Sequence, residues 1–379
     1  MNPTIEIAVI GGGLVGSIAA QCFAHRGQQV TQFFPSNTDR STIDYPLSLR
    51  PSSRDTLEKL GLWSDDYLIT AMRQLHLSSE GCFGMVNIAR DNNQPAAYVV
   101  SARRLMEHIQ HVIQRQKRVA QVNTSINRVD DAQQDIKIHA ADRHWGCQRL
   151  VICDGTRSPI SNQLQIPCTK HPSVAESIVC KVTTSHWSAG SGYVRKSRDQ
   201  ILGCIPMSAN SGWIIVTQLA GQFDAELSSE RQLVSLFNRC LSSRIGQVVD
   251  CEIVSNQKSI LQSRAVASHE KMILLGNASL STPPVGAQGL NIAIQDCAAL
   301  HKLQQHFPWH RSTSKAWGAQ FSADCQPRHD HWFRQMERLL AHLRGYGTYS
   351  RVFERTAWAL LGVSQRAQHQ LEALGLGYG

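Results

Sequence analysis

Three glycines near the N-terminus have the spacing of a site that holds a phosphate group. Gly11, Gly13 and Gly16 form the pattern GxGxxG, which follows the apolar segment 5–10 and precedes the helix-forming segment 17–25. In this setting the first glycine permits a tight turn, the second lets a pyrophosphate approach the backbone, and the third lets helix and strand pack closely. Amides at the start of the helix favour the negative charge of the phosphates. The pattern predicts dinucleotide binding, with a purely structural glycine turn as the alternative.

The acidic residue that normally completes such a site is missing. It should end the second strand, about 20 residues after the glycines, where its carboxylate would bind the adenosine ribose. Here the strand 30–34 ends in Phe34, and Asp39 lies a few residues further on and could compensate. We therefore expect the adenosine end of a dinucleotide to be held more weakly than usual.

Two further segments narrow the kind of dinucleotide site. Asp154-Gly155-Thr156-Arg157-Ser158 follows the strand 150–153, and GNAS at 276–279 is followed by PPVGAQGLN at 283–291. Together with the N-terminal glycines, these segments resemble the three fingerprints of the para-hydroxybenzoate hydroxylase superfamily of flavoprotein monooxygenases, in the family's order. GNAS…PPVGAQGLN and LEKLGLW at 57–63 are most similar to the ubiquinone-biosynthesis hydroxylases, the 2-polyprenyl-6-methoxyphenol hydroxylase group.

The resemblance implies a reaction and a set of cofactor contacts. FAD would be reduced by NADPH or NADH, and one oxygen atom of O2 would pass to an electron-rich ring, a polyprenylated phenol on the way to ubiquinone. No catalytic side chain is assigned. The cofactor-binding residues would be Gly11, Gly13, Gly16, Arg103, Asp154, Gly155, Gly276, Asn277, Pro284, Gly286, Gln288, Gly289 and Asn291.

Some of these positions match the family's pattern and others depart from it. Asn277 stands where the family usually has an aspartate that binds the ribityl chain, and asparagine can still donate and accept there. Leu280 replaces the usual histidine or glutamine. Pro284 and Gly286 leave room for the backbone to lie against a flat ring, and the helix that begins near Gly289 would direct its amides at the anionic reduced flavin.

Arg103 begins a helix where the superfamily often places an arginine that contacts the flavin. Arg104 follows it directly, so the register of this assignment is open by one residue.

The elements that must position these residues alternate between strand and helix at the start of the chain, which is typical of an α/β fold with a parallel sheet. From about 173 to 261, short β-rich segments separated by Ser, Asn and Gly predict an inserted antiparallel sheet. We expect a Rossmann-type FAD-binding domain (1–72, 100–172 and 268–320), a substrate-binding sheet domain (73–99 and 173–267) and C-terminal helices (321–379).

Composition limits the partners of the chain. The net charge is +9, but the basic residues are dispersed and no nucleic-acid motif accompanies them, so we expect no nucleic-acid partner. An anionic cofactor, a phosphorylated nicotinamide donor, a negatively charged membrane surface or a generally basic surface would each account for the charge. Cysteines without any CxxC pair favour free thiols, and the N-terminus lacks signal-peptide features, so we expect a cytoplasmic protein.

Two features near the C-terminus allow a functional and a structural interpretation. Arg344, Arg351 and Arg355 lie among apolar residues and could rest on the inner face of a membrane, although packing of these helices on the FAD domain is the stronger alternative. His329-Asp330-His331 suggests a metal site, but histidines two residues apart on a helix point in different directions, so we expect none.

Two other functions stay open. One is hydroxylation of a different, soluble aromatic compound in secondary metabolism, because PPVGAQGLN also looks like para-hydroxybenzoate hydroxylase itself. The other is a degenerate paralogue that has lost tight FAD binding and acts as a scaffold in a biosynthetic complex, which Phe34 and Leu280 both favour.

Overall fold

The first sheet is built around parallel strands. The structure is a computed structural model that describes residues 4–343 apart from 36–43, 83–84, 90–93, 132–135, 142, 189, 222–228 and 307–313. The strand order is β17-β18-β11-β1-β2-β8, and a hairpin of β9 and β10 pairs with β11. The bounds are β1 Ile5–Ile10, β2 Val30–Phe34, β8 Val119–Asn123, β9 Arg128–Asp131, β10 Ile136–His139, β11 His144–Ile152, β17 Ala267–His269 and β18 Met272–Leu274.

Helices cover this sheet because its strands are apolar on both faces. The glycine turn leads into α1 (Leu14–His25), which contacts α3 (Ala102–Arg115) and α6 (Gln288–His306). Their buried side chains form one core with β1 and β2. The shorter helical segments are α2 (Pro51–Lys59), η1 (Asp65–Tyr67), α4 (Pro159–Gln163) and η4 (Gly276–Ala278).

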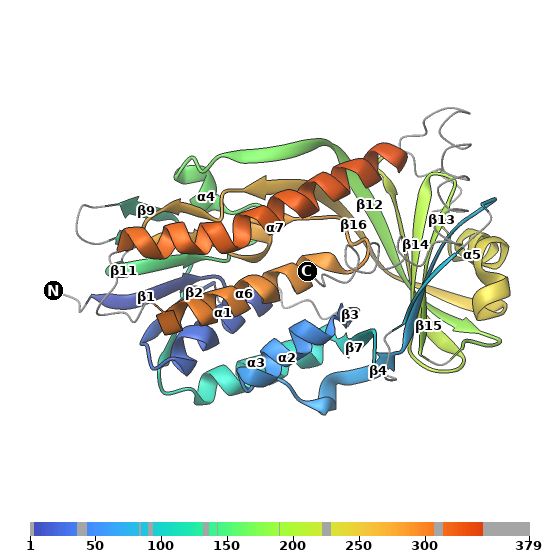
Figure 1. The fold of residues 1–379 in the computed structure, drawn as a ribbon, viewed down its shortest axis with the longest axis horizontal. Helices are drawn as coiled ribbons and strands as arrows, with labels where there is room; N and C mark the ends of the chain where they lie inside the picture. Colours follow the sequence, from blue (N-terminus) through green and yellow to red (C-terminus); the bar gives the residue numbers. More distant parts are fainter. Residues whose placement is uncertain are drawn as a thin grey trace.

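A second sheet of eight strands lies beside the first. Its order is β19-β16-β12-β15-β14-β13-β5-β6, and all neighbours are antiparallel except β5 and β13. The bounds are β5 Gln74–Ser79, β6 Val86–Ala89, β12 Cys168–Thr184, β13 Ser191–Ser197, β14 Gln200–Pro206, β15 Ser211–Leu219, β16 Val248–Arg264 and β19 Leu280–Ser281. Figure 1 shows the long strands β12 and β16 running from the first sheet into the second.

The second sheet has two different faces. Helix α5 (Glu230–Ile245) packs on one face, against a core that includes Ile178, Leu202 and Ile214. Side chains alternate along a strand, so the residues between these point to the opposite face. A third, small sheet has the order β3-β7-β4 (Pro46–Leu49, Ala97–Ser101 and Leu68–Met72). Along the chain, its strands come where the chain passes from the first large sheet to the second and back.

The last described helix, α7 (Ser314–Leu343), closes the fold. Its apolar stripe Phe333, Met336, Leu340 and Leu343 is buried against residues of the second sheet, and the helix also contacts α6, β17 and β18. His329 is fully buried, and its Nε2 lies 2.7 Å from Oδ2 of Asp296 on α6. This histidine therefore ties α7 to α6. Arg344, Arg351 and Arg355 lie outside the described residues.

The α/β fold class with an antiparallel second sheet and C-terminal helices is confirmed. Helix α5 and the full length of β12 and β16 differ from the prediction, which had only short β-rich segments in this part of the chain. No helix in the described part of the chain combines the length and apolarity needed to cross a bilayer.

Candidate functional site

The glycine turn between β1 and α1 has the geometry that a phosphate site requires. Gly11 has a φ of +129°, and a Cβ at that position would lie 2.3 Å from the carbonyl oxygen of Cys153. A Cβ on Gly16 would lie equally close to the carbonyl oxygen of Gly11. Gly13, the N-cap of α1, has open space in front of it, and no side chain caps the helix. The first helical amides are thus free to bind an anion.

A network of polar side chains, three amides and one hydroxyl group, lies under this turn. Nε2 of Gln32 donates to the carbonyl oxygen of Gly11 (2.9 Å) and to Oγ of Ser17 (3.2 Å). Gln110 donates to the same Ser17 hydroxyl, and Gln121 donates to both Gln32 and Gln110. The network joins β2, α1, α3 and β8, and it holds the glycine turn in place. Sequence reasoning missed it, because the four residues are far apart along the chain.

Phe34 ends β2 and lies directly against the glycine turn. A Cβ on Gly12 would be 2.6 Å from Cγ of Phe34, so ring and turn are in close contact. Phe34 is buried, and its side chain offers no hydrogen-bond acceptor at this place. Asp39 lies outside the described residues.

Asp154 and Gly155 follow β11 at the same edge of the sheet. Both carboxylate oxygens of Asp154 are buried without a hydrogen bond of good geometry among the described residues, although the hydroxyl group of Ser158 and the amide of Ile160 lie close enough to lower the pKa of the carboxyl group in part. Burial raises the pKa of this carboxyl group above its ordinary value of 3.8. Gly155 has a φ of +89° with open space in front of it. A buried acceptor beside an open backbone fits the hydroxyl groups of a bound cofactor, which would supply the missing donors.

Because burial disfavours the charged form of Asp154, the carboxyl group costs the apoprotein stability at neutral pH. The stability that protonation provides is fully present below pH 3.8 and is lost as pH rises through the raised pKa. We expect Asp154→Asn to raise the denaturant midpoint of the apoprotein at pH 7, with the difference vanishing in acid, and to weaken FAD binding roughly tenfold.

Asp130→Asn is the matched control, since a hydrogen bond from Arg128 lowers the pKa of that exposed carboxyl group. It should not stabilise the apoprotein at pH 7. If the denaturant midpoint rose equally in both variants, the charged carboxyl group of Asp154 would not be the cause of the lower stability at pH 7.

The turn η4 and the loop after it face the second sheet. Gly276 has a φ of +63°, and a Cβ there would lie 3.1 Å from the side chain of Val15 on α1. Asn277 is exposed at the tip of η4, and Pro284 and Gly286 are exposed in the loop 283–287. Gly286 and Ala287 both adopt positive φ values, which turn the chain sharply before α6. The exposed backbone can thus meet a flat group.

Asn277 and the loop border a cavity of about 310 Å³ that lies between this loop and the second sheet. Its walls come from η4, the loop and start of α6, β3 and the face of the second sheet opposite α5. The lining residues are Tyr45, Pro46, Leu47, Ser48, Met72, Leu75, Ser177, Val179, Tyr193, Val194, Gly203, Cys204, Ile205, Ile215, Gln257, Asn277, Thr282, Pro283, Pro284, Gly286, Ala287, Gln288, Gly289 and Leu290. The loop 283–287, which the sequence predicts to contact the cofactor, is called the cofactor loop below. The cavity lies between the cofactor loop and a largely apolar face of the second sheet.

The side chain of Asn291 is used within the protein. Its Oδ1 accepts from the amide of Arg50 and the hydroxyl of Ser53, and its Nδ2 donates to the carbonyl oxygens of Ser48 and Ala287. It thereby fixes the junction of β3 and α2 against the cofactor loop. Any contact of Asn291 with a cofactor would have to come from its backbone.

Leu280 and Arg103 stand at the edges of this site. Leu280 is buried in an apolar cluster with Leu261, Val285 and Phe333, so packing accounts for the leucine. Arg103 is half exposed at the start of α3, where its amide donates to Asp44 at 3.2 Å. Neither lines the cavity.

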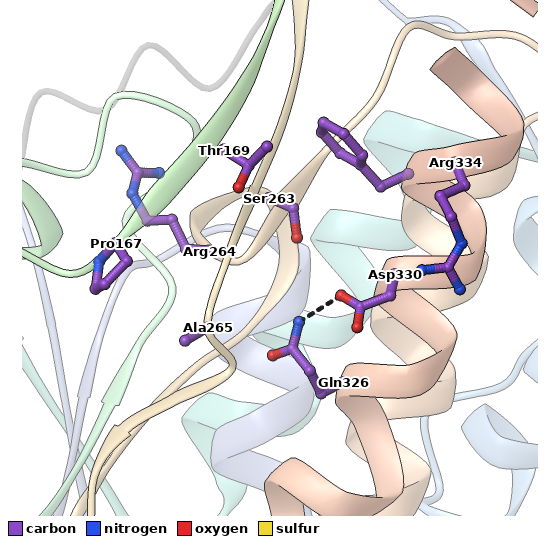
Figure 2. A pocket seen from close by; sticks show the side chains of 9 residues that line it. Pro167, Thr169, Ser263, Arg264, Ala265, Gln326, Asp330 and Arg334 are labelled. Carbon is purple, nitrogen blue, oxygen red and sulfur yellow. Dashed lines mark hydrogen bonds between the residues drawn. The ribbon is translucent and has the colours of Figure 1, made fainter. Parts of the chain in front are cut away.

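A second cavity of about 240 Å³ lies between α7 and the ends of β12 and β16. Figure 2 shows Gln326 donating to Asp330 across one side of it, with Arg334 beside them. The guanidinium group of Arg264 points away from these residues and donates to the carbonyl oxygen of Ala278 and to Asn162. Arg264 thus supports η4, which carries Asn277.

Comparison with known proteins agrees with this geometry. The FAD-binding-domain family matches residues 4–307. Among solved structures, p-nitrophenol 4-monooxygenase PnpA from Pseudomonas putida DLL-E4 is similar over 99% of both chains, with 14% identity and a TM-score of 0.75. PqsL from P. aeruginosa, in complex with 2-aminobenzoylacetate, is similar over 96% of this chain and 100% of its own, with 15% identity and a TM-score of 0.74.

The Diels-Alderase PyrE3 of pyrroindomycin biosynthesis is also similar, over 99% of this chain and 80% of its own, with 14% identity and a TM-score of 0.71. One fold therefore serves more than one reaction in these proteins, and at such identities the likeness concerns the fold. The family match covers all three predicted fingerprints, and the chain therefore belongs to the FAD-binding-domain family, with FAD as its cofactor and the fold of aromatic hydroxylases.

Proposed function

We propose that this protein is an FAD-dependent monooxygenase that hydroxylates an aromatic ring. The observation that carries the proposal is the cavity of about 310 Å³, because it places the cofactor loop opposite an apolar sheet face that can hold a ring. In the balanced reaction, the ring C–H, O2, NAD(P)H and a proton give the hydroxylated ring, water and NAD(P)⁺. One oxygen atom enters the product and the other leaves as water.

Bound FAD would carry electrons from the nicotinamide donor to O2. The residues of the chain would bind the cofactor and orient the substrate. Gly11, Gly13 and Gly16 would admit the pyrophosphate, and Asp154 would accept hydrogen bonds from hydroxyl groups of the cofactor. The amides at the start of α6 would stabilise negative charge in front of them. The apolar sheet face would exclude water from the ring.

The finer proposal concerns the substrate. The similarity of 57–63 and 276–291 to ubiquinone-biosynthesis hydroxylases supports a polyprenylphenol. Part of the cavity of about 310 Å³ must receive the cofactor, so only the aromatic head would lie inside and a prenyl chain would extend out of it. Contact of the protein with a membrane surface would follow from such a substrate.

A non-catalytic scaffold is the second candidate, and Phe34 at the adenosine end is the observation that favours it. Leu280 does not support the scaffold function, because its side chain is part of the apolar core. Anaerobic mixing of the purified protein with saturating FAD and then NADPH or NADH separates the two candidates. The enzyme should reduce the bound flavin faster than free FAD is reduced, whereas equal rates with both donors and a panel of phenols would leave the scaffold.

A further inference from the structure

The cavity has no charged side chain among the described residues that line it. Its polar groups are hydroxyl and amide groups, such as those of Ser48, Ser177, Thr282 and Gln257. Oγ of Ser177 lies 2.9 Å from Oγ1 of Thr217 on the neighbouring strand, so these two hydroxyl groups already bind each other. A carboxylate on a ring that lies over the sheet face would therefore lose its water without gaining a cationic side chain among the described lining residues, which is costly.

The floor of the cavity is an apolar row that crosses four strands. In register, Val194 on β13 pairs with Gly203 on β14, Gly203 pairs with Ile215 on β15, and Ile215 pairs with Val179 on β12. All four line the cavity. All four are also only partly buried, unlike Leu202 and Ile214 on the α5 face of the same strands. The row thus offers apolar surface toward the cofactor loop.

Gly203 leaves a gap in the middle of this row. A Cβ there would meet only the carbonyl oxygen of Ile215, at 4.0 Å, so it would project into free space. The other two glycines in strands of this sheet are packed tightly: a Cβ would lie 2.2 Å from Sδ of Met72 at Gly192 and 2.4 Å from Trp187 at Gly212. Gly203 has no positive φ either. Neither backbone conformation nor packing requires glycine here.

A glycine inside a strand weakens the strand, and it often marks a place where a ligand comes close to the backbone. Resting on the proposed function, we infer that the substrate is an uncharged aromatic compound whose ring lies over Gly203. The missing side chain gives the ring its space, and the uncharged lining excludes aromatic carboxylates. Gly203 therefore determines specificity for ring size, and the uncharged side chains among the described lining residues determine specificity for charge.

The test uses the FAD-loaded protein and two probes that differ in charge, methyl 4-hydroxybenzoate and 4-hydroxybenzoate. Titration of each probe is followed by the change in the flavin absorption spectrum, which measures binding without turnover. We expect the ester to bind at least tenfold more tightly than the carboxylate. Equal affinity, tighter binding of the carboxylate, or binding of neither probe would overturn the inference.

A variant tests the position of the ring. Gly203→Val should weaken binding of the ester at least tenfold and leave the Kd of FAD unchanged, and Gly203→Ala should have a smaller effect in the same direction. Leu202→Val, on the same strand but facing α5, should not alter ester binding. Unchanged ester binding in Gly203→Val would overturn the proposed position.

The outcomes also separate this inference from the proposed function. Selective binding of the ester without any hydroxylated product would contradict the proposed monooxygenase function and support the inference that the site binds an uncharged aromatic compound. Hydroxylation of ester and carboxylate with equal kcat/KM would confirm the monooxygenase and reject the uncharged class of substrate.

Discussion

Gly286→Val should abolish FAD binding while the protein stays folded. Gly286 lines the cavity at a φ of +68°, and a Cβ there would lie 3.3 Å from Nε2 of Gln288, so a branched side chain would crowd Gln288 and occupy the surface on which the isoalloxazine ring would lie. We expect the Kd of FAD to rise by about a hundredfold or more, which corresponds to about 2.7 kcal/mol. Flavin content after purification and fluorescence titration with FAD measure the effect.

The same substitution also strains the backbone, because a β-branched residue at positive φ costs about 1–3 kcal/mol. Gly61→Val is the matched control: Gly61 has a φ of +67°, its Cβ would meet nothing, and it lies after α2 outside the cavity. Both variants should lose stability through the backbone strain, Gly286→Val also crowds Gln288, and only Gly286→Val should lose FAD. A normal flavin spectrum in Gly286→Val would show that the ring lies elsewhere.

Phe34→Glu should tighten FAD binding by about tenfold to a hundredfold. The side chain at this position ends β2 against the glycine turn, where a carboxylate could accept hydrogen bonds from the adenosine ribose. Such charge-assisted hydrogen bonds contribute about 1.5–3 kcal/mol. Isothermal titration calorimetry with FAD gives the dissociation constants of the unmodified apoprotein and of the Phe34→Glu apoprotein.

Phe34→Leu controls for the loss of the aromatic ring, because leucine keeps the site apolar and adds no acceptor. It should bind FAD no more tightly than the unmodified protein. If Phe34→Glu leaves the Kd unchanged, another acceptor already holds the ribose, and Asp39→Ala would then weaken FAD binding.

The parts of the site that sequence reasoning found are those that depend on local backbone conformation. Gly11, Gly155, Gly276 and Gly286 all adopt positive φ values, and short motifs encode such turns directly. The helix α5 also had a local signal, since Leu233, Leu236, Phe237 and Leu241 recur at helical spacing and are buried on one face. The β-rich stretches on both sides of this segment favour strands, and they obscure the helical signal between them.

The parts that were missed depend on contacts between distant segments. Gly203 has no local signal, and its meaning appears only when the strand register places it between Val194 and Ile215. Leu280 departs from the family's cofactor motif, and its burial beside Leu261 and Phe333 gives this leucine a packing role. Asn291 matched a cofactor motif, yet its side chain holds β3 and α2 in place. Cofactor contacts by the individual motif residues stay predictions.

The most direct test of the proposed reaction follows the oxygen atom. The FAD-saturated protein is incubated with NADPH or NADH, 18O-labelled O2 and an uncharged phenol, either a short-chain prenylphenol or methyl 4-hydroxybenzoate, and the product is examined by mass spectrometry. The account predicts a hydroxylated ring that carries one labelled oxygen atom and is formed in proportion to the nicotinamide consumed. Absence of hydroxylated product, or product whose added oxygen comes from water, would contradict it.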